Sequence, residues 1–169
     1  LISTEELKKQ SFEDILKDRF KEYIGKSYSE LCEVFGLEES TAKSKYALIA
    51  NAILTMRGTR CDDVTKSEEF RKSGIRIKTI RLQKSGRPKE AMSFENINYF
   101  DILEEDDWYE SRLYELFTSR FLFIVFKDCG SKGEEDYRLQ KVFFWTMPYD
   151  DLKDAAAYWQ NIRDNVAAN

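Results

Sequence analysis

The stretch Gly74-Ile75-Arg76-Ile77-Lys78-Thr79-Ile80-Arg81-Leu82 decides how the chain is expected to fold. It is rich in β-branched residues and partly alternates apolar with charged side chains, which is typical of a strand with one face in a core. The turn residues Lys84-Ser85-Gly86-Arg87-Pro88 follow it, and a second extended run occupies residues 91–97. This pattern predicts a β-hairpin made of residues 75–82 and 91–97.

Two further strands are expected later in the chain. Residues 121–127 form an apolar run long enough for a central strand, and residues 137–147 supply a partner across the polar loop 129–136. A helix at residues 109–118 is expected to join the two pairs of strands. The apolar spacing of residues 149–166 predicts a closing helix.

Three helices are expected before any strand. Ser11 begins a capped amphipathic helix that ends near Gly25, and Ser27 begins a second helix with a capping-box pattern that stops at Gly36. Residues 41–57 form the third helix, which ends at the glycine that follows. The sequence therefore predicts an α+β fold with a mixed β-sheet flanked by helices, including three N-terminal helices.

Length and composition indicate one globular domain. The chain has 169 residues, of which 42% are hydrophobic, so a single domain over residues 1–169 with one substantial core is expected. No apolar run is long enough to cross a bilayer and the N-terminus lacks the features of a signal peptide, which indicates a cytoplasmic protein with no membrane partner. The first residue is not Met, so we expect a fragment of a longer protein.

The residue types exclude several catalytic classes. The chain contains no histidine, which removes Ser-His-Asp hydrolysis, Cys-His hydrolysis and most catalytic zinc sites. Cys32, Cys61 and Cys129 are odd in number and far apart, which fits neither a disulfide framework nor a zinc site. We expect reduced thiols, with Cys32 in the core, and only carboxylate and lysine chemistry remains.

Basic residues gather in residues 71–89, although the net charge of the chain is −4. The segment holds eight cations and no Asp or Glu, so the rest of the chain carries −12. These cations are Arg71, Lys72, Arg76, Lys78, Arg81, Lys84, Arg87 and Lys89. Such a run is typical of a phosphate-facing stripe that binds DNA through counterion release. It is also typical of a solvated hairpin edge that Lys and Arg protect from aggregation.

Several strings along the chain carry a resemblance to a known family. They are Tyr28-Ser29-Glu30-Leu31, Phe35-Gly36-Leu37, residues 46–54, residues 74–80, Ser85-Gly86-Arg87-Pro88-Lys89-Glu90, Met92-Ser93-Phe94, Thr118-Ser119-Arg120-Phe121-Leu122-Phe123 and Phe143-Phe144-Trp145-Thr146-Met147-Pro148. Their order and spacing resemble the MutH family of GATC-specific endonucleases, and most closely the C-terminal, MutH-like half of a two-domain type II restriction enzyme. The resemblance implies a restriction-endonuclease-like fold.

The resemblance also implies where a catalytic centre would lie. In the family an Asp and a Glu hold Mg²⁺, and a Lys two residues after the Glu orients the attacking water. The pattern of Asp, six residues, Glu, one residue and Lys falls here at Glu69, Arg76 and Lys78. A supporting carboxylate falls at Asn51 and a second Lys at Phe117. We therefore expect no intact catalytic set and no cofactor in this chain, with Mg²⁺ expected only for an active nuclease domain.

Arg76 is the substitution that matters most. A permanent cation in place of a metal-bridging carboxylate reverses the local charge and repels Mg²⁺. The same guanidinium binds phosphate well, and Arg76 and Lys78 point to one face of an ideal strand. The sequence thus predicts a cleft that holds DNA without cutting it. The alternative is that Arg76 forms a partly buried ion pair with Glu69.

Three functions remain open. The first is a catalytically inactive effector domain of a GATC-type type II restriction enzyme, which binds a second site on double-stranded DNA through the eight cations and promotes cleavage by a catalytic domain of the same protein. The second is an active Mg²⁺-dependent endonuclease whose displaced carboxylates, used with Lys78, are Asp62, Asp63, Glu68 and Glu69. The third is a protein-interaction domain that uses exposed aromatics such as Trp108 or Tyr109.

Overall fold

The chain forms two compact units. A computed structural model describes residues 2–56 and 64–168. Unit 1 comprises Leu1–Ala91 and Phe121–Phe144, and unit 2 comprises Met92–Arg120 and Trp145–Asn169. The single domain expected over residues 1–169 stays a prediction. No helix in the described ranges has the length and apolar character needed to span a bilayer.

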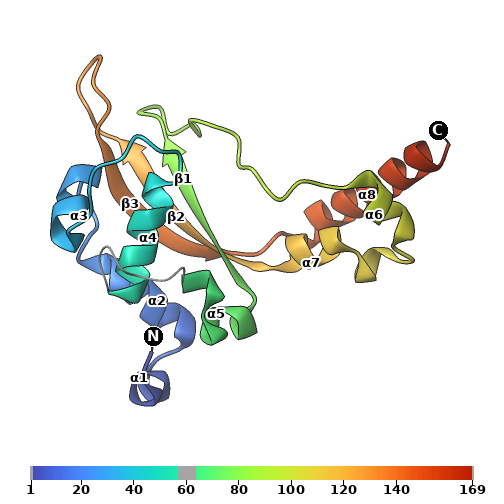
Figure 1. Ribbon diagram of the computed structural model, residues 1–169, viewed down its shortest axis with the longest axis horizontal. Coiled ribbons are helices and arrows are strands. Elements are labelled where there is room, and N and C mark those ends of the chain that lie inside the picture. Colours follow the sequence, from blue (N-terminus) through green and yellow to red (C-terminus); the bar gives the residue numbers. More distant parts are fainter. Residues whose placement is uncertain (1, 57–63, 169) are drawn as a thin grey trace. The chain divides into compact units, whose positions relative to one another are not determined.

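In unit 1, helices precede and cover a three-stranded sheet (Figure 1). Its elements are α1 (Thr4–Lys9), α2 (Phe12–Lys21), α3 (Tyr28–Phe35), α4 (Lys45–Thr55), the short 3-10 helix η1 (Val64–Lys66), α5 (Glu68–Ser73), β1 (Ile75–Leu82), β2 (Arg120–Asp128) and β3 (Tyr137–Trp145). The prediction of an α+β fold with N-terminal helices is confirmed. Two short helices, α1 and α5, were not among the three expected ones.

Local capping signals set the ends of α2 and α3. The Ser11 side chain accepts a hydrogen bond from the backbone N–H of Asp14, and Ser27 and Glu30 complete a capping box. Gly36 ends α3 with a left-handed φ of 61°, a conformation that glycine adopts without steric cost. Leu16, Phe20, Leu31 and Cys32 are buried on the inner sides of these helices. The expected core position of Cys32 is therefore confirmed, whereas Cys61 lies outside the described residues.

The third expected helix is shorter than the sequence suggested. Residues 41–57 were expected to be helical, but α4 begins at Lys45 and ends at Thr55. Met56 takes up a left-handed conformation with φ of 54°, and its backbone N–H donates to the carbonyls of Ala52 and Ile53. This arrangement ends the helix at Met56 itself and needs no glycine.

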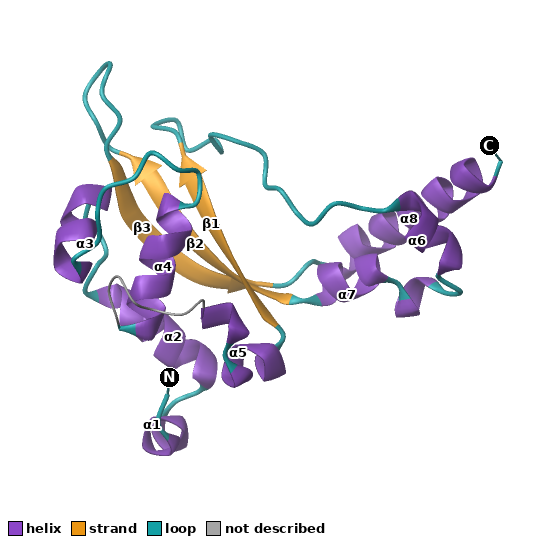
Figure 2. Ribbon diagram, in the orientation of Figure 1, coloured by secondary structure: helices purple, strands orange, loops and turns teal. Residues whose placement is uncertain are grey.

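The expected hairpin of residues 75–82 and 91–97 is wrong in its second half. The turn forms, because Gln83 donates to Arg87, Lys89 donates to Arg81 and an isolated bridge joins Leu82 to Pro88. The chain then leaves the sheet without a second strand, and residues 91–98 have no regular structure. The neighbour of β1 is β2, and both strands end at the same edge of the sheet (Figure 2). Parallel neighbours need a long crossover, which unit 2 supplies.

The centre of unit 1 is β2, as expected. Every residue from Phe121 to Phe126 is buried, and β3 runs back beside β2 across the loop 129–136 to make the sheet mixed (Figure 2). One sheet face joins the main core, in which residues of α2, α3 and α4 meet Ile75, Leu122, Ile124 and other strand residues. By strand alternation, Phe121, Phe123 and Val125 lie on the other face.

Unit 2 is helical and has its own small core. It consists of α6 (Tyr99–Glu104), the 3-10 helix η2 (Trp108–Glu110), α7 (Arg112–Thr118) and α8 (Tyr149–Ala167). The buried Trp159 of α8 donates its indole N–H to Glu105 at 2.6 Å. Helices α7 and α8 fall close to the expected ranges 109–118 and 149–166, and α6 was missed.

Candidate functional site

Arg76 and Lys78 lie together on one strand. Both belong to β1, and both are half-buried. Ile75 and Ile77 pack against the main core, so strand alternation directs Arg76 and Lys78 to the opposite face of the sheet. The structure therefore presents two cations side by side at the positions where the expected pattern places a metal-binding Glu and its Lys.

The other three expected positions lie on helices. Asn51 is half-buried on α4, and Glu69 is the second residue of α5. The pKa of Glu69 is lowered, first because its carboxylate accepts a hydrogen bond from its own backbone N–H at the start of the helix. Phe117 belongs to α7 in unit 2, where its ring packs edge-to-face on Phe94 at 6.4 Å between centroids. Whether Asn51, Glu69, Arg76 and Lys78 act as one site stays a prediction.

The donor set at these positions does not suit Mg²⁺. Magnesium is held in proteins by carboxylate and other oxygen ligands, whereas Arg76 and Lys78 bring two positive charges and no oxygen. Within residues 2–56 and 64–168, no group of three or more Asp, Glu, Cys or His side chains could hold a metal ion. Asp62 and Asp63, two of the displaced carboxylates considered above, lie outside the described residues. A third candidate, Glu68, is 76% exposed and pairs with Lys72 at 2.6 Å.

The eight cations of residues 71–89 do not form one uniform stripe. Arg71 and Lys72 are exposed on α5, and Arg87 is exposed in the turn after β1. Arg76 and Lys78 occupy the middle of the strand on one face. The remaining three, Arg81, Lys84 and Lys89, are engaged with acids or carbonyl groups at the end of β1. Their expected role in DNA binding stays a prediction. The three groups differ in exposure and in existing partners, so each would contact a DNA backbone in its own way.

Arg81 is held between two tyrosines and a carboxylate. Its guanidinium donates to both oxygens of Glu90 at 2.7 to 2.9 Å. It also lies 5.4 Å from the ring centroid of Tyr46 and 5.6 Å from that of Tyr137, within the range of cation–π attraction. Burial raises the pKa of Tyr46 to about 12, so the ring carries a neutral hydroxyl beside the cation.

Lys84 and Lys89 join the turn after β1 to the loop between β2 and β3. The ammonium of Lys84 donates to the carbonyls of Ser131 and Glu134, at 2.5 and 3.4 Å. Lys89 pairs with Glu135 and lies 5.2 Å from the ring centroid of Tyr137. The two segments border a cavity of about 570 Å³ that is open to solvent, here called the loop pocket. Its lining is Gln83, Lys84, Ser85, Lys89, Asp128, Gly133, Glu134, Glu135 and Tyr137.

Asp128 closes the loop at its base. Its carboxylate accepts hydrogen bonds from the backbone N–H groups of Asp136 and Gly130, each at 3.0 Å. A side chain at Gly130 would meet the carbonyl oxygen of Glu134 at 2.3 Å, so the tight turn requires glycine here. The pKa of Asp128 is lowered, mainly because of the bond from Asp136, followed by the bond from Gly130 and the nearby charges of Lys84 and Lys89.

This lowered pKa predicts that acid loosens the loop 129–136. A carboxylate with a lowered folded-state pKa stabilises the fold fully above its ordinary value of 3.8, and the contribution is lost as the pH falls through the lower value. Amide hydrogen exchange of residues 129–136 is therefore expected to rise as the pH falls below about 4, after correction for intrinsic rates. Asp128→Asn should remove this pH dependence, and an unchanged acid response in that variant would contradict the assignment.

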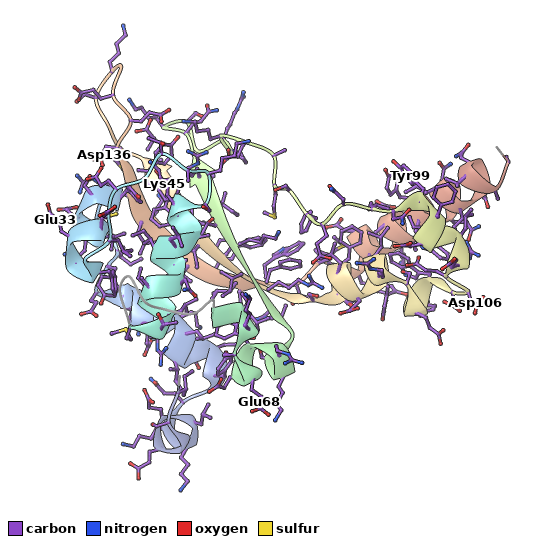
Figure 3. The ribbon with its side chains drawn as sticks, in the orientation of Figure 1. Glu33, Lys45, Glu68, Tyr99, Asp106 and Asp136 are labelled. Atoms are coloured by element: carbon purple, nitrogen blue, oxygen red, sulfur yellow. The ribbon has the colours of Figure 1, made fainter. Side chains whose placement is uncertain are left out.

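Sequence reasoning missed the aromatic surroundings of these cations. The tyrosine–cation cluster consists of Tyr28, Lys45, Tyr46, Arg81, Lys89 and Tyr137, and Figure 3 labels Lys45 and Asp136 at this end of unit 1. Its members come from α3, α4, β1, the turn after β1 and β3. No local motif marks such a set, because the residues meet only when the sheet and helices have packed.

The two aromatic residues considered for a protein interface differ in exposure. Tyr109 is 70% exposed, as expected. Trp108 is not an exposed contact residue, because its half-buried ring packs on Tyr114 at 5.6 Å and on Trp159 at 5.9 Å within unit 2. Tyr109 is thus the exposed member of the two, and a role for either residue at a protein interface stays a prediction.

Comparisons with known proteins agree with this fold. The family model described as the DNA mismatch repair enzyme MutH matches residues 62–155. The chain is also 35% identical over 156 residues to the type II restriction enzyme Sau3AI of Staphylococcus aureus, an alignment that covers 87% of this chain and 31% of that enzyme. The chain thus spans about a third of the length of this relative. From the family match and the mixed sheet flanked by helices, we conclude that the chain belongs to the MutH family and has its restriction-endonuclease-like α+β fold.

Proposed function

We propose that this chain is the DNA-binding, catalytically inactive domain of a type II restriction endonuclease, and that it holds a GATC site as an effector of cleavage. The observation that carries the proposal is the pair Arg76 and Lys78 on one half-buried strand face. A guanidinium and an ammonium at these positions attract a DNA phosphate and repel the metal ion that cleavage requires. The cut itself is assigned to a catalytic domain elsewhere in the same protein.

The distribution of charge supports unit 1 as the part that binds DNA. Unit 1 contains 23 Lys and Arg against 19 Asp and Glu, whereas unit 2 contains 4 against 12. Their net charges are therefore +4 and −8. Because phosphate contacts dominate the affinity of proteins for DNA, the basic unit is the one that a duplex would contact.

Binding of the 169-residue chain to duplexes with and without GATC tests this proposal. We expect tighter binding to the GATC duplex, and an affinity for both that falls with salt by about 0.9 logarithmic units per phosphate contact and decade of salt. Equal affinity for the two duplexes would remove GATC recognition and leave DNA binding. Absence of binding at low salt would remove the proposal as a whole.

The active-nuclease alternative makes a different prediction. It requires carboxylates drawn from Asp62, Asp63, Glu68 and Glu69 to hold Mg²⁺ beside Lys78. Nicking of a GATC plasmid that needs Mg²⁺ and disappears in Lys78→Ala would establish it, whereas our proposal expects no nicking with or without the metal.

A further inference from the structure

The end of unit 1 holds two ion pairs in which the cation is the better-buried partner. The side chain of Arg81 is 20% exposed and that of Glu90 is 55% exposed. The side chain of Lys89 is 31% exposed and that of Glu135 is 60% exposed. In both pairs, therefore, the cation belongs to the framework of the site and the carboxylate covers it from the solvent side.

Aromatic rings fix the two cations in place. Tyr137 lies 5.6 Å from Arg81 and 5.2 Å from Lys89, measured to the ring centroid. Tyr137 itself is buried and packs against Tyr46 with 5.9 Å between centroids. Because cation–π contacts hold the charges at one side of each ring, Arg81 and Lys89 keep their positions when a carboxylate partner moves away.

Lys84, which also lines the loop pocket, binds the loop 129–136 and not an exposed carboxylate. Its ammonium donates to two backbone carbonyls of the loop 129–136 and lies 3.9 Å from the carboxylate of Asp128, which is only 11% exposed. These partners belong to the backbone and to the base of the loop, so Lys84 ties the loop to the turn after β1. It is a positioning residue and leaves Arg81 and Lys89 as the cations that can exchange partners.

The carboxylates occupy positions that suit a phosphate. Arg81 donates from Nε and Nη2 and reaches both carboxylate oxygens of Glu90, the geometry in which a guanidinium also binds phosphate. Both carboxylates are more than half exposed, at 55% for Glu90 and 60% for Glu135. Water can therefore replace either one as it leaves, and a duplex that brings several phosphates can take its place. The loop pocket is open and about 570 Å³ in volume beside Lys89 and Tyr137, which leaves room for a sugar-phosphate backbone.

We infer that Arg81 and Lys89 form a binding site for backbone phosphates of duplex DNA, and that Glu90 and Glu135 cover this site as carboxylate stand-ins until DNA displaces them. This inference rests on the proposed DNA-binding function and assigns part of it to named residues. It also predicts that neutralising either of these two glutamates raises the affinity for DNA by more than the change in net charge alone would raise it.

Two neighbouring glutamates provide a matched test. Glu135→Gln and Glu134→Gln change the net charge equally and lie one residue apart. Within the described part of the chain, the Glu134 carboxylate makes no ion pair, whereas Glu135 pairs with Lys89. We expect Glu135→Gln to bind a duplex about 2- to 5-fold more tightly than Glu134→Gln, the range that corresponds to an exposed ion pair. Fluorescence anisotropy at a fixed, low salt concentration measures the difference.

The cation side of the site gives the opposite result. Lys89→Gln is expected to weaken duplex binding several-fold and to lower the slope of affinity against salt by about 1. In the double variant Lys89→Gln with Glu135→Gln, the gain from Glu135→Gln should disappear. Equal affinities of Glu135→Gln and Glu134→Gln, with normal DNA binding by the unchanged chain, would overturn the inference and leave the proposed function standing.

A second experiment tests whether the site binds a phosphate of DNA or a free anion. Inorganic phosphate, titrated into the same variants, measures whether the site takes an isolated phosphate. A gain for inorganic phosphate in Glu135→Gln without a gain for the duplex would assign the site to a free anion and overturn the inference. Failure of the unchanged chain to bind any duplex would instead defeat the proposed function on which it rests.

Discussion

Arg76→Glu is expected to weaken duplex binding in the absence of divalent metal by about 10- to 100-fold, the loss that corresponds to one charge-assisted hydrogen bond to phosphate. The variant removes a guanidinium from the half-buried face of β1 and replaces it with a carboxylate that repels phosphate. Anisotropy titrations with a GATC duplex in the presence of a chelator measure the change.

The matched control is Arg71→Glu. It changes the net charge by the same amount at an exposed cation of the same basic segment, on α5, so it separates the effect of the half-buried position 76 from that of an exposed charge. We expect its loss of affinity to be well below that of Arg76→Glu. Equal losses in the two variants would show that position 76 has no special role and would contradict the proposed contact of Arg76 with DNA.

Metal binding supplies an independent readout of the same position. Combining Arg76→Glu with Glu69→Asp puts the Asp and the Glu of the family pattern at positions 69 and 76. If these positions and Lys78 form one site, we expect a heat of Mg²⁺ or Mn²⁺ binding in calorimetry that the unchanged chain lacks. The ion-pair alternative predicts otherwise. If Arg76 serves only to pair with Glu69, Arg76→Gln lowers the free energy of unfolding and leaves DNA affinity unchanged.

The elements that the sequence predicts well are those with local signals. The boundaries of α3 follow from Ser27, Glu30 and Gly36, which act within the helix and its two ends. The buried strand β2 follows from an uninterrupted apolar run. In each case the residues that determine the structure are close neighbours in the chain, so the pattern can be read without knowing the fold.

The pairing of β1 was not accessible in this way. Residues 91–97 have the composition of a strand, but Met92, Phe94 and Ile97 remain 38 to 40% exposed and the chain turns toward unit 2. The partner that β1 finds is β2, which follows only after the helices of unit 2. Strand pairing depends on packing between distant segments, and the hairpin turn at Gly86 specifies only its own few residues.

In the candidate site, too, local features could be predicted from the sequence and contacts between distant segments could not. The cations of residues 71–89 could be counted from the sequence, and Arg76 and Lys78 share a strand face as expected. The partners Ser131, Glu134 and Glu135 could not be assigned, because only the folded sheet brings the loop 129–136 to the turn after β1. A segment's net charge therefore overstates the charge available to DNA, and unit 1 as a whole carries only +4.

Tyr46→Ala is expected to lower the free energy of unfolding of the chain by about 3 to 5 kcal/mol, the usual cost of removing a large buried ring. Tyr46 is 4% exposed and lies at the centre of the tyrosine–cation cluster. Its ring packs on Phe126 at 4.7 Å, on Tyr28 at 5.4 Å and on Tyr137 at 5.9 Å between centroids. One truncation therefore removes the aromatic contacts of α4 with both β2 and β3, and urea denaturation followed by circular dichroism measures the loss.

Tyr46→Phe separates the packing of the ring from its hydroxyl. The variant keeps the contacts with Phe126 and the aromatic face toward Arg81, so we expect a loss of no more than about 1.5 kcal/mol, within the range of one hydrogen bond. Comparable losses in Tyr46→Phe and Tyr46→Ala would contradict the packing role. The pair also bears on DNA binding, because only Tyr46→Ala removes the ring beside Arg81. A folded Tyr46→Ala chain with lower duplex affinity than Tyr46→Phe would connect the core of unit 1 to the phosphate site, since the same ring that closes the core also holds the cation.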